Sequence, residues 1–180
     1  MSNSRLLVPR MIRAARLDSY FYEEVEADRS ANWQALQVVL ISGLASAIGY
    51  GIATVWMDDP PELWKIFVSL MISTIAGWFA WSFFTWIIGT TLFKTPQTSS
   101  NYGELLRTIG FAHAPLVLAV FLFVPYVGGI IYFMAGIWSL IAGVVAVRQA
   151  LDFSTARAIG TCIIGWILYQ LLFVFVIGTF

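Results

Sequence analysis

The residue best suited to do chemistry in this sequence is His113, the only histidine of the chain. It stands in an apolar stretch, after Arg107 and shortly before Pro115. A neutral imidazole nitrogen can ligate the metal of a haem or a chlorophyll-type pigment, and it can also relay a proton. In a third, purely structural interpretation the ring bonds to a backbone or hydroxyl group. The sequence leaves these roles open, with His113 as a candidate axial ligand.

Aromatic residues in a second apolar stretch could provide a surface for a flat ligand. Trp78, Trp81 and Phe84 lie away from the predicted water interfaces. Such rings either fill a helix bundle and face lipid, or they stack on a bound molecule. These three residues are therefore candidate contacts to a bound lipid, a quinone or a chlorophyll-type pigment.

The motifs that mark most enzyme active sites are absent from the sequence. It holds no Gly-rich phosphate loop, no HExxH motif and no GxSxG motif. The single cysteine, Cys162, excludes a disulfide within the chain, a zinc knuckle and a CxxC redox pair. No acidic or basic residue lies within the predicted apolar cores, where pumps, ion-coupled transporters and intramembrane hydrolases usually place one. The sequence predicts a protein that is not an enzyme and has no metal site.

The candidate residues must be positioned by helices that cross a membrane. Of the 180 residues, 59% are apolar and 11% are charged, whereas soluble domains carry about 25% charged residues. A spanning helix needs about 20 mostly apolar residues. The four long stretches without any charged residue are 30–57, 66–93, 108–147 and 158–180. The third is long enough for two spans, and the others hold one each.

Proline and glycine divide the third stretch. Pro125 and the pair Gly128 and Gly129 mark a turn, because proline removes a backbone donor and paired glycines weaken a helix. Pro115 marks a kink that frees the carbonyl of Phe111. The predicted fold is all-α, an integral membrane bundle of five transmembrane helices at 33–56, 64–93, 105–124, 127–149 and 156–179.

The distribution of positive charge predicts how the bundle lies in the membrane. With five spans, every Lys and Arg except Lys65 falls on the side of the N-terminus. The positive-inside rule places this side in the cytoplasm and the C-terminus outside. No cleavable signal peptide is visible before Trp33. The net charge of zero gives no general case for a nucleic-acid partner.

Residues 1–29 are predicted to be a short amphipathic cytoplasmic leader, ahead of a transmembrane domain at 30–180. The first half of the leader mixes arginines with apolar residues, so it either lies on lipid headgroups or forms a fraying tail. The second half predicts a short acidic helix with Phe21, Tyr22 and Val25 on one face. This face is expected to pack under the bundle or against a partner.

Small residues recur at every fourth position in two of the predicted spans. They are Gly43, Ala47 and Gly51 in the first span, and Ala135, Ser139 and Gly143 in the fourth. Helices associate in lipid through close backbone approach, because burying apolar surface gives no advantage over lipid tails. Both spans are therefore predicted to be interior helices, with partners within the chain or in another subunit.

Several short motifs follow one another in a distinctive order. They are Asp18-Ser19-Tyr20-Phe21-Tyr22-Glu23-Glu24-Val25 with Asp28, Glu104-Leu105-Leu106-Arg107 with Gly110-Phe111 and Pro115, Pro125 with Gly128-Gly129, Ile137-Trp138-Ser139-Leu140, Arg148-Gln149-Ala150-Leu151, and Ser154-Thr155-Ala156-Arg157-Ala158. In this order and spacing they resemble the Yip family of five-span membrane proteins, named for interaction with Ypt/Rab GTPases in eukaryotes. The resemblance covers almost the whole chain after residue 8 and implies the family's fold and topology.

One departure from the eukaryotic pattern bears on the source of the chain. Asn101-Tyr102-Gly103-Glu104 stands where eukaryotic members carry an Asp-Leu-Tyr-Gly-Pro-type motif, and the proline is missing. The compact chain therefore looks more like the bacterial members. The resemblance implies a location in a bacterial inner membrane.

Three functions are open at this point. The first is a non-enzymatic scaffold or accessory subunit that packs against other integral membrane proteins, within a larger respiratory or photosynthetic complex. The second is a transporter or permease for a neutral or lipid-like substrate, with discontinuous helices around Pro115 and Gly128. The third is a membrane-trafficking adaptor for small GTPases, which requires a eukaryotic source.

Overall fold

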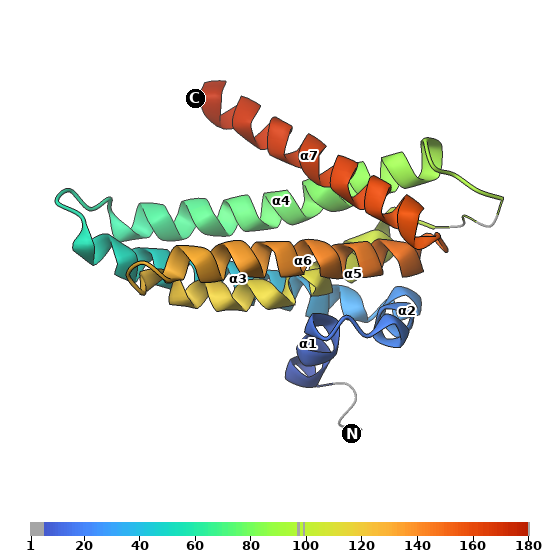
Figure 1. Cartoon of the computed structure of the whole chain (residues 1–180), viewed down its shortest axis with the longest axis horizontal. Helices are drawn as coiled ribbons and strands as arrows, with labels where there is room; N and C mark the ends of the chain where they lie inside the picture. The colour runs from blue at the N-terminus through green and yellow to red at the C-terminus, as the bar shows by residue number, and fades with distance from the viewer. Residues whose placement is uncertain (1–5, 97, 99, 180) are drawn as a thin grey trace.

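In a computed structural model of the chain, a bundle of long helices carries two short helices near one end (Figure 1). The structure describes residues 6–96, 98 and 100–179, and within these ranges it describes side chains as far as Phe175, apart from Trp56. The described residues contain no strand. The helices are α1 (Leu7–Ala15), α2 (Ser19–Ala27), α3 (Ala31–Ala53), η2 (Thr54–Trp56), α4 (Leu63–Thr91), α5 (Tyr102–Ala112), η3 (Ala114–Phe123), α6 (Gly128–Ala150) and α7 (Thr155–Thr179).

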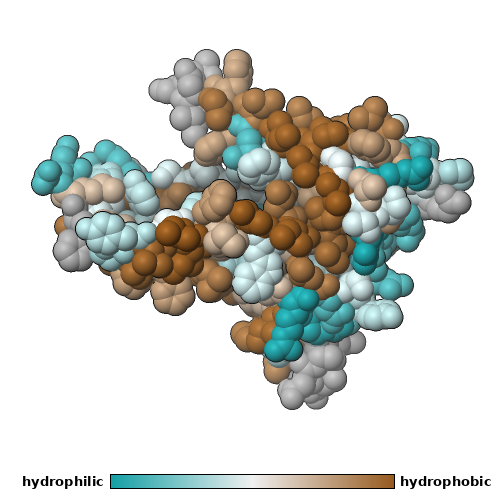
Figure 2. Space-filling model, in the orientation of Figure 1, coloured by the Kyte–Doolittle hydropathy of each residue, from teal (hydrophilic) through white to brown (hydrophobic). Residues whose placement is uncertain are grey.

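Five stretches of helix are long and apolar enough to cross a membrane, which confirms the predicted fold class. They are Ala31–Ala53, Leu63–Thr91, Tyr102–Phe123, Gly128–Ala150 and Thr155–Phe175. Each begins within three residues of the span expected from the sequence. Figure 2 shows hydrophobic residues over the middle of the molecule and hydrophilic residues toward its two ends, as a bilayer-spanning protein requires. The cytoplasmic placement of the N-terminus stays a prediction from the charge distribution.

The spans pack around the third one, α5 and η3, which is the most buried of the five, although the first and fourth were expected to be the interior helices. Helix α3 contacts α4, α5 and η3, whereas α6 contacts α5, η3 and α7. Helix α7 also contacts α4, but it slants across the bundle so that its C-terminal end stands apart (Figure 1). Leu171, Val174 and Phe175 near that end are 60%, 68% and 72% exposed. The described side chains near this end of α7 therefore lie mostly on the surface of the bundle.

Helix α2 belongs to the hydrophobic core. The Asp18 carboxylate accepts a hydrogen bond from Phe21 N at 3.2 Å and caps the helix. Phe21, Tyr22 and Val25 are completely buried, and the Phe21 ring meets the Phe111 ring edge-on, with centroids 5.2 Å apart. The acidic helix thus packs under the bundle, which is one of the two placements that the sequence allowed.

The third span is broken where α5 ends and the 3₁₀ helix η3 begins. A 3₁₀ turn would bond the amide of residue 115 to the carbonyl of Ala112, but Pro115 has no N–H to donate. The hydroxyl of Ser139 donates to this Ala112 carbonyl at 2.8 Å. The Ser42 hydroxyl donates to the next carbonyl, that of His113, at 2.9 Å. Hydroxyls of neighbouring helices therefore stabilise the break. They bond to the carbonyls of Ala112 and His113, whereas the sequence predicted a free carbonyl at Phe111.

These bonds predict unequal effects of two serine substitutions. Ser139→Ala is expected to lower the free energy of unfolding by about 2 kcal/mol, because it leaves the buried Ala112 carbonyl without a donor. Ser42→Ala is expected to cost about 1 kcal/mol, because the His113 carbonyl keeps its bond from Leu116 N at 2.9 Å. Thermal unfolding of the purified chain measures both effects.

Ser69→Ala is the matched control for these variants. The Ser69 hydroxyl bonds only within its own helix, to the carbonyl of Ile66 at 3.1 Å. Its loss is expected to change the melting temperature little. If Ser139→Ala behaves like Ser69→Ala, the bond to Ala112 does not support the break.

The turn between η3 and α6 has one position that requires glycine. Pro125 O accepts from Val127 N at 2.8 Å, and Tyr126 adopts a left-handed conformation with φ 63°. A Cβ atom at Gly128 would lie 2.7 Å from the carbonyl carbon of Leu122. Gly129 has open space around its missing Cβ. The turn lies where the sequence predicted it, at Pro125, Gly128 and Gly129. Of the two glycines, only Gly128 lies too close to its neighbours to be replaced by a larger residue.

Candidate functional site

One partly enclosed cavity lies within the membrane-spanning part of the bundle. It has a volume of about 590 Å³ and is lined by α3, α4, α6 and α7, with His113 and Leu116 from the broken third span. Its size is that of a site for a small molecule. It brings together His113, Trp78 and Trp81 of the residues selected from the sequence. Phe84 does not line it.

His113 lies at the floor of this cavity with its ring almost buried, 7% exposed. Its Nδ1 atom lies 2.9 Å from the carbonyl oxygen of Ile109. Because a carbonyl only accepts, Nδ1 carries the hydrogen and Nε2 has a free lone pair. The ring centroid lies 5.8 Å from that of Trp81. The structure thus gives His113 the backbone bond of the structural interpretation, and Nε2 is left to meet a ligand.

The two tryptophans are held by their ring nitrogens. Trp78 Nε1 donates to the Leu106 carbonyl at 2.7 Å, and Trp81 Nε1 donates to the Cys162 carbonyl at 3.3 Å. Their donors are therefore occupied, and they offer the cavity mainly aromatic surface.

Phe84 lies on another side of α4, although the sequence grouped it with the two tryptophans. A step of six residues turns the helix by about 240° from Trp78. Its ring instead meets that of Phe83 at 5.9 Å. The structure therefore separates Phe84 from the cavity.

Hydroxyl groups line the inner part of the cavity. Besides Ser42 and Ser139, Ser46 donates to the Ser42 carbonyl at 3.0 Å, and Thr74 donates to the Leu70 carbonyl at 2.8 Å. Each hydroxyl hydrogen is thus bonded to backbone, and each oxygen keeps lone pairs that can accept. No Asp, Glu, Lys or Arg is among the described residues that line the cavity. Its floor is uncharged and rich in hydrogen-bond acceptors.

The mouth of the cavity is apolar and faces outward. Tyr132, Phe133 and Ile137 of α6 are 46%, 66% and 39% exposed, and Trp166 of α7 is 37% exposed. Surfaces of spanning helices that the bundle leaves exposed meet lipid chains. The cavity therefore opens sideways toward the hydrocarbon of the membrane.

The first small-residue stripe faces α4. A Cβ at Gly43 would lie 3.2 Å from Met71 Sδ, and one at Gly51 would lie 3.7 Å from Leu63. Ala47 is buried. The stripe thus lies at a contact within this chain.

The second stripe faces the interior from α6. Ala135 and Ser139 are buried, and a Cβ at Gly143 would lie 2.7 Å from the Trp81 ring. Two equally close approaches were not expected from the sequence, at Gly77 against the Tyr169 hydroxyl and at Gly110 against Ala35, both 2.7 Å. Small residues do stand four positions away, Ser73 from Gly77 and Ala114 from Gly110, so spacing alone does not show which glycines lie against a neighbouring helix.

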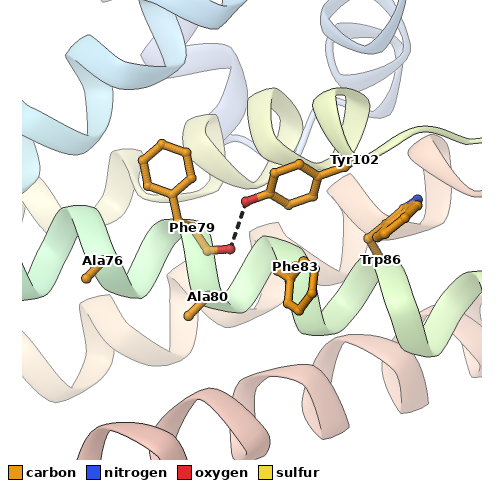
Figure 3. Close-up of a pocket in the computed structure, with 6 residues that line it drawn as sticks. All are labelled: Ala76, Phe79, Ala80, Phe83, Trp86 and Tyr102. Carbon is orange, nitrogen blue, oxygen red and sulfur yellow. Dashed lines mark hydrogen bonds between the residues drawn. The ribbon is translucent and has the colours of Figure 1, made fainter. Parts of the chain in front are cut away.

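A second, open groove lies on the outer side of α4. It has a volume of about 530 Å³ and is lined by alanines and aromatic rings only. Figure 3 shows Tyr102 reaching over α4 toward Phe79, and its hydroxyl donates to the Phe79 carbonyl at 3.0 Å. Phe79 and Phe83 are each 43% exposed. Apolar contact with lipid or with another helix is the chemistry that this groove offers.

The arginine of α1 points into the protein. Arg10 is 3% exposed and pairs with Asp28 at 3.4 Å and with Gln34. Its guanidinium lies 5.6 Å from the centroid of Phe21 and 5.3 Å from that of Phe111. Neither a helix on lipid headgroups nor a fraying tail describes this residue, because the carboxylate and the two ring faces hold the cation.

The Asp28 carboxylate is stabilised in its charged form. The Ser30 hydroxyl and backbone N–H donate to it, at 2.5 and 3.0 Å. These bonds, with the nearby Arg10 cation, lower the pKa of Asp28. The ion pair thus holds α1 against the start of α3.

Arg107 fixes the other end of α2. Its Nε donates to the carbonyls of Val25 and Glu26, each at 2.9 Å, and its terminal nitrogen also bonds to Glu26. Carbonyls at a helix C-terminus lack intrahelical donors and attract cations. Arg107, itself 5% exposed, therefore joins α2 to α5.

Glu26, near the C-terminus of α2, is a side chain whose protonation should change near neutral pH. Burial, followed by repulsion from Glu104 and Asp152, raises the pKa of Glu26 to about 7, although Arg107 opposes the shift. Between pH 4.5, which is the ordinary pKa of a glutamate, and about pH 7, Glu26 holds a proton in the folded chain and releases it in the unfolded chain. Stability is therefore highest below this window and falls as the pH rises through it.

A glutamine at this position tests the pH dependence. From pH 5 to pH 8 the wild-type melting temperature is expected to fall by about 2–4 °C more than that of Glu26→Gln, which is about 1 kcal/mol after solvent screening. Glu23→Gln, at an exposed position of the same helix, should follow the wild type. Equal pH profiles for wild type and Glu26→Gln would exclude Glu26 as the responsible group.

Comparison with known proteins identifies the fold. Residues 16–178 match the family described as the Yip1 domain, so the match includes α2 and all five spans. No curated protein and no solved structure matches the chain. The family match agrees with the resemblance to the Yip family that the sequence motifs indicate. Because it covers almost the entire chain, this integral membrane protein belongs to the Yip1 family.

Proposed function

We propose that this chain is a non-enzymatic scaffold or accessory subunit, which packs against another integral membrane protein. The observation that supports the proposal most is the position of α7, the least buried of the five spans. Its last described side chains are mostly exposed, and within the chain it packs on α4 and α6. In lipid, a helix is held in place by side-chain packing and by hydrogen bonds to other helices. A partner helix beside α7 would supply the missing contacts.

The aromatic groove of Figure 3 extends the surface that is open to a partner. It lies on α4, which also contacts α7. Its rings present a large apolar area without charge, which suits a transmembrane helix and not a soluble domain. The proposed setting is a larger respiratory or photosynthetic complex in a bacterial inner membrane.

Site-directed photocrosslinking in the native membrane tests this role. A photoreactive residue in place of Leu171, which is 60% exposed on α7, is expected to form an adduct with one integral membrane protein. The same residue in place of Leu44, which is 42% exposed on α3, serves as the control and should label lipid. Adducts of equal pattern at both positions, or lipid adducts alone, would contradict a partner at α7.

Transport of a neutral or lipid-like substrate is the second candidate. It is supported by the broken third span at the floor of the cavity, since transporters bind substrates where helices are interrupted. Flux of such a substrate into proteoliposomes that contain only this chain would favour transport over the scaffold. The scaffold role predicts no flux.

A further inference from the structure

The intramembrane cavity combines two properties that rarely occur together. It lies among spanning helices, where an unsatisfied polar group costs several kcal/mol. Its floor nevertheless presents the free Nε2 lone pair of His113 and the hydroxyl oxygens of Ser42 and Ser139. These polar atoms gain a hydrogen bond only from a molecule that enters the cavity.

The hydrogen bonds of the lining decide which group fits the floor. The hydroxyls of Ser42 and Ser139 already donate to carbonyls, and Nδ1 of His113 donates to Ile109. The ring nitrogens of Trp78 and Trp81 are also bonded to carbonyls. Acceptors thus remain at the floor, and their partner must be a donor. A carbonyl, which only accepts, would find no hydrogen at His113, Ser42 or Ser139. Other possible side-chain donors of the lining include Ser73, Tyr132, Tyr169 and Gln170.

Charge and shape restrict the ligand further. The described lining residues include no cation or carboxylate, and an ion without a counter-charge is costly to bring into such a site. The mouth between α6 and α7 is apolar, with exposed Phe133, Ile137 and Trp166. A molecule that fits therefore has an uncharged head and a hydrocarbon body that leaves through the mouth into the membrane.

We propose that the cavity binds an uncharged amphiphile whose hydroxyl group donates a hydrogen bond to Nε2 of His113. Its ring or glycerol portion lies against Trp78 and Trp81, and its tail lies along the mouth. A diacylglycerol and a quinol are two membrane molecules with this chemistry. The proposal concerns the interior of the bundle and does not depend on a partner at α7.

Two matched ligand pairs test the hydrogen bond. The first is dioleoylglycerol with brominated acyl chains and its 3-O-methyl ether, which lacks the hydroxyl hydrogen but keeps the tails. Bromine quenches the tryptophans at the cavity, so fluorescence of the purified full chain reports binding. The alcohol is expected to reach half-saturation at about a tenfold lower concentration than the ether. The second pair is a short-chain quinol and its quinone, with displacement of the brominated alcohol as the readout.

Variants of His113 show whether the discrimination arises at Nε2. His113→Phe keeps a ring but removes the acceptor, and it is expected to bind the alcohol and the ether equally. His113→Gln supplies an amide oxygen and should restore part of the preference. Thr90→Val is the control, because the Thr90 hydroxyl donates to the Trp86 carbonyl at 2.7 Å on the same helix as Trp81 but outside the cavity.

The outcomes separate the sources and decide the proposal. If only the glycerol pair shows tighter binding of the hydroxyl compound, the ligand is a neutral lipid. If only the quinol pair shows it, the ligand is a redox lipid. Either result supports the proposal if His113→Phe abolishes the difference in binding. Equal binding within both pairs, no binding, or a preference that His113→Phe retains would overturn it. A visible absorption band that His113→Phe removes would also overturn it, because Nε2 would then ligate a pigment metal.

Discussion

Arg107→Met is expected to lower the melting temperature of the purified chain by about 6–12 °C, which corresponds to about 3 kcal/mol. The substitution keeps an unbranched apolar side chain but removes the donors that bond to the carbonyls of Val25 and Glu26. The Val25 carbonyl keeps a bond from Asp28 N at 3.2 Å. The Glu26 carbonyl lies at the C-terminus of α2, where no helical N–H can replace the lost donor. The contact between α2 and α5 should therefore loosen first.

Two further measurements make this expectation specific. Arg157→Met removes a cation at an exposed position of α7 and should leave the melting temperature within about 1 °C. Limited trypsin digestion should cut the Arg107→Met variant faster than wild type after Arg13 or Arg29, on either side of α2. Unchanged melting and unchanged digestion of Arg107→Met would show that the arginine does not hold α2.

Gly110→Ala is expected to destabilise the bundle by about 2–3 kcal/mol, although alanine is the better helix former. A Cβ at this position would lie 2.7 Å from that of Ala35 and 3.1 Å from Trp78 Nε1. Helices α3 and α5 would have to separate, and the bond from Trp78 to the Leu106 carbonyl would be strained. The expected readout is a lower melting temperature together with a red shift of tryptophan fluorescence.

Gly136→Ala is the matched control for the same substitution. Gly136 also lies within a spanning helix, but a Cβ there would meet nothing within 4 Å. Its replacement is expected to leave stability unchanged or to raise it by up to about 1 kcal/mol through helix propensity. If both variants shift the melting temperature equally, the close approach of α3 and α5 does not limit stability.

The spans could be predicted because charge and length determine them directly. An apolar stretch long enough to cross a bilayer and free of charge has few alternatives to a spanning helix. Pro125 also divides the third charge-free stretch in the structure, because the turn there cannot continue a helix. The core face of α2 was recognised from Phe21, Tyr22 and Val25, which share one side of an amphipathic helix.

Contacts between distant parts of the chain could not be read in the same way. Arg10 looked like a headgroup-binding residue because its partner Asp28 and its ring neighbour Phe111 come together only in the folded chain. Phe84 was grouped with Trp78 by composition, but helix rotation over six residues places it on another side of α4. Gly77 and Gly110 are single glycines whose importance depends on the side chain opposite each of them. Packing of this kind requires the arrangement of the helices as well as their positions in the sequence.

The cavity contains both a residue that could be selected from the sequence and contacts that could not. His113 could be selected from the sequence because it is a polar residue in an apolar span. Its free nitrogen could not be assigned, because the tautomer depends on the bond to Ile109. The hydroxyls of Ser42 and Ser139 meet at the break in the third span only after α3 and α6 have packed around it.

The central claim, that the chain packs against another integral membrane protein, is tested most directly by extracting it from its native membrane. A tagged chain would be purified in mild detergent, and the mass and the absorption spectrum of the particle would be recorded together. The proposed role predicts a particle that contains the partner captured at position 171 and loses it when Leu171 and Val174 are both replaced by aspartate. A particle of one or two copies of this chain alone, unchanged by those replacements, would contradict it.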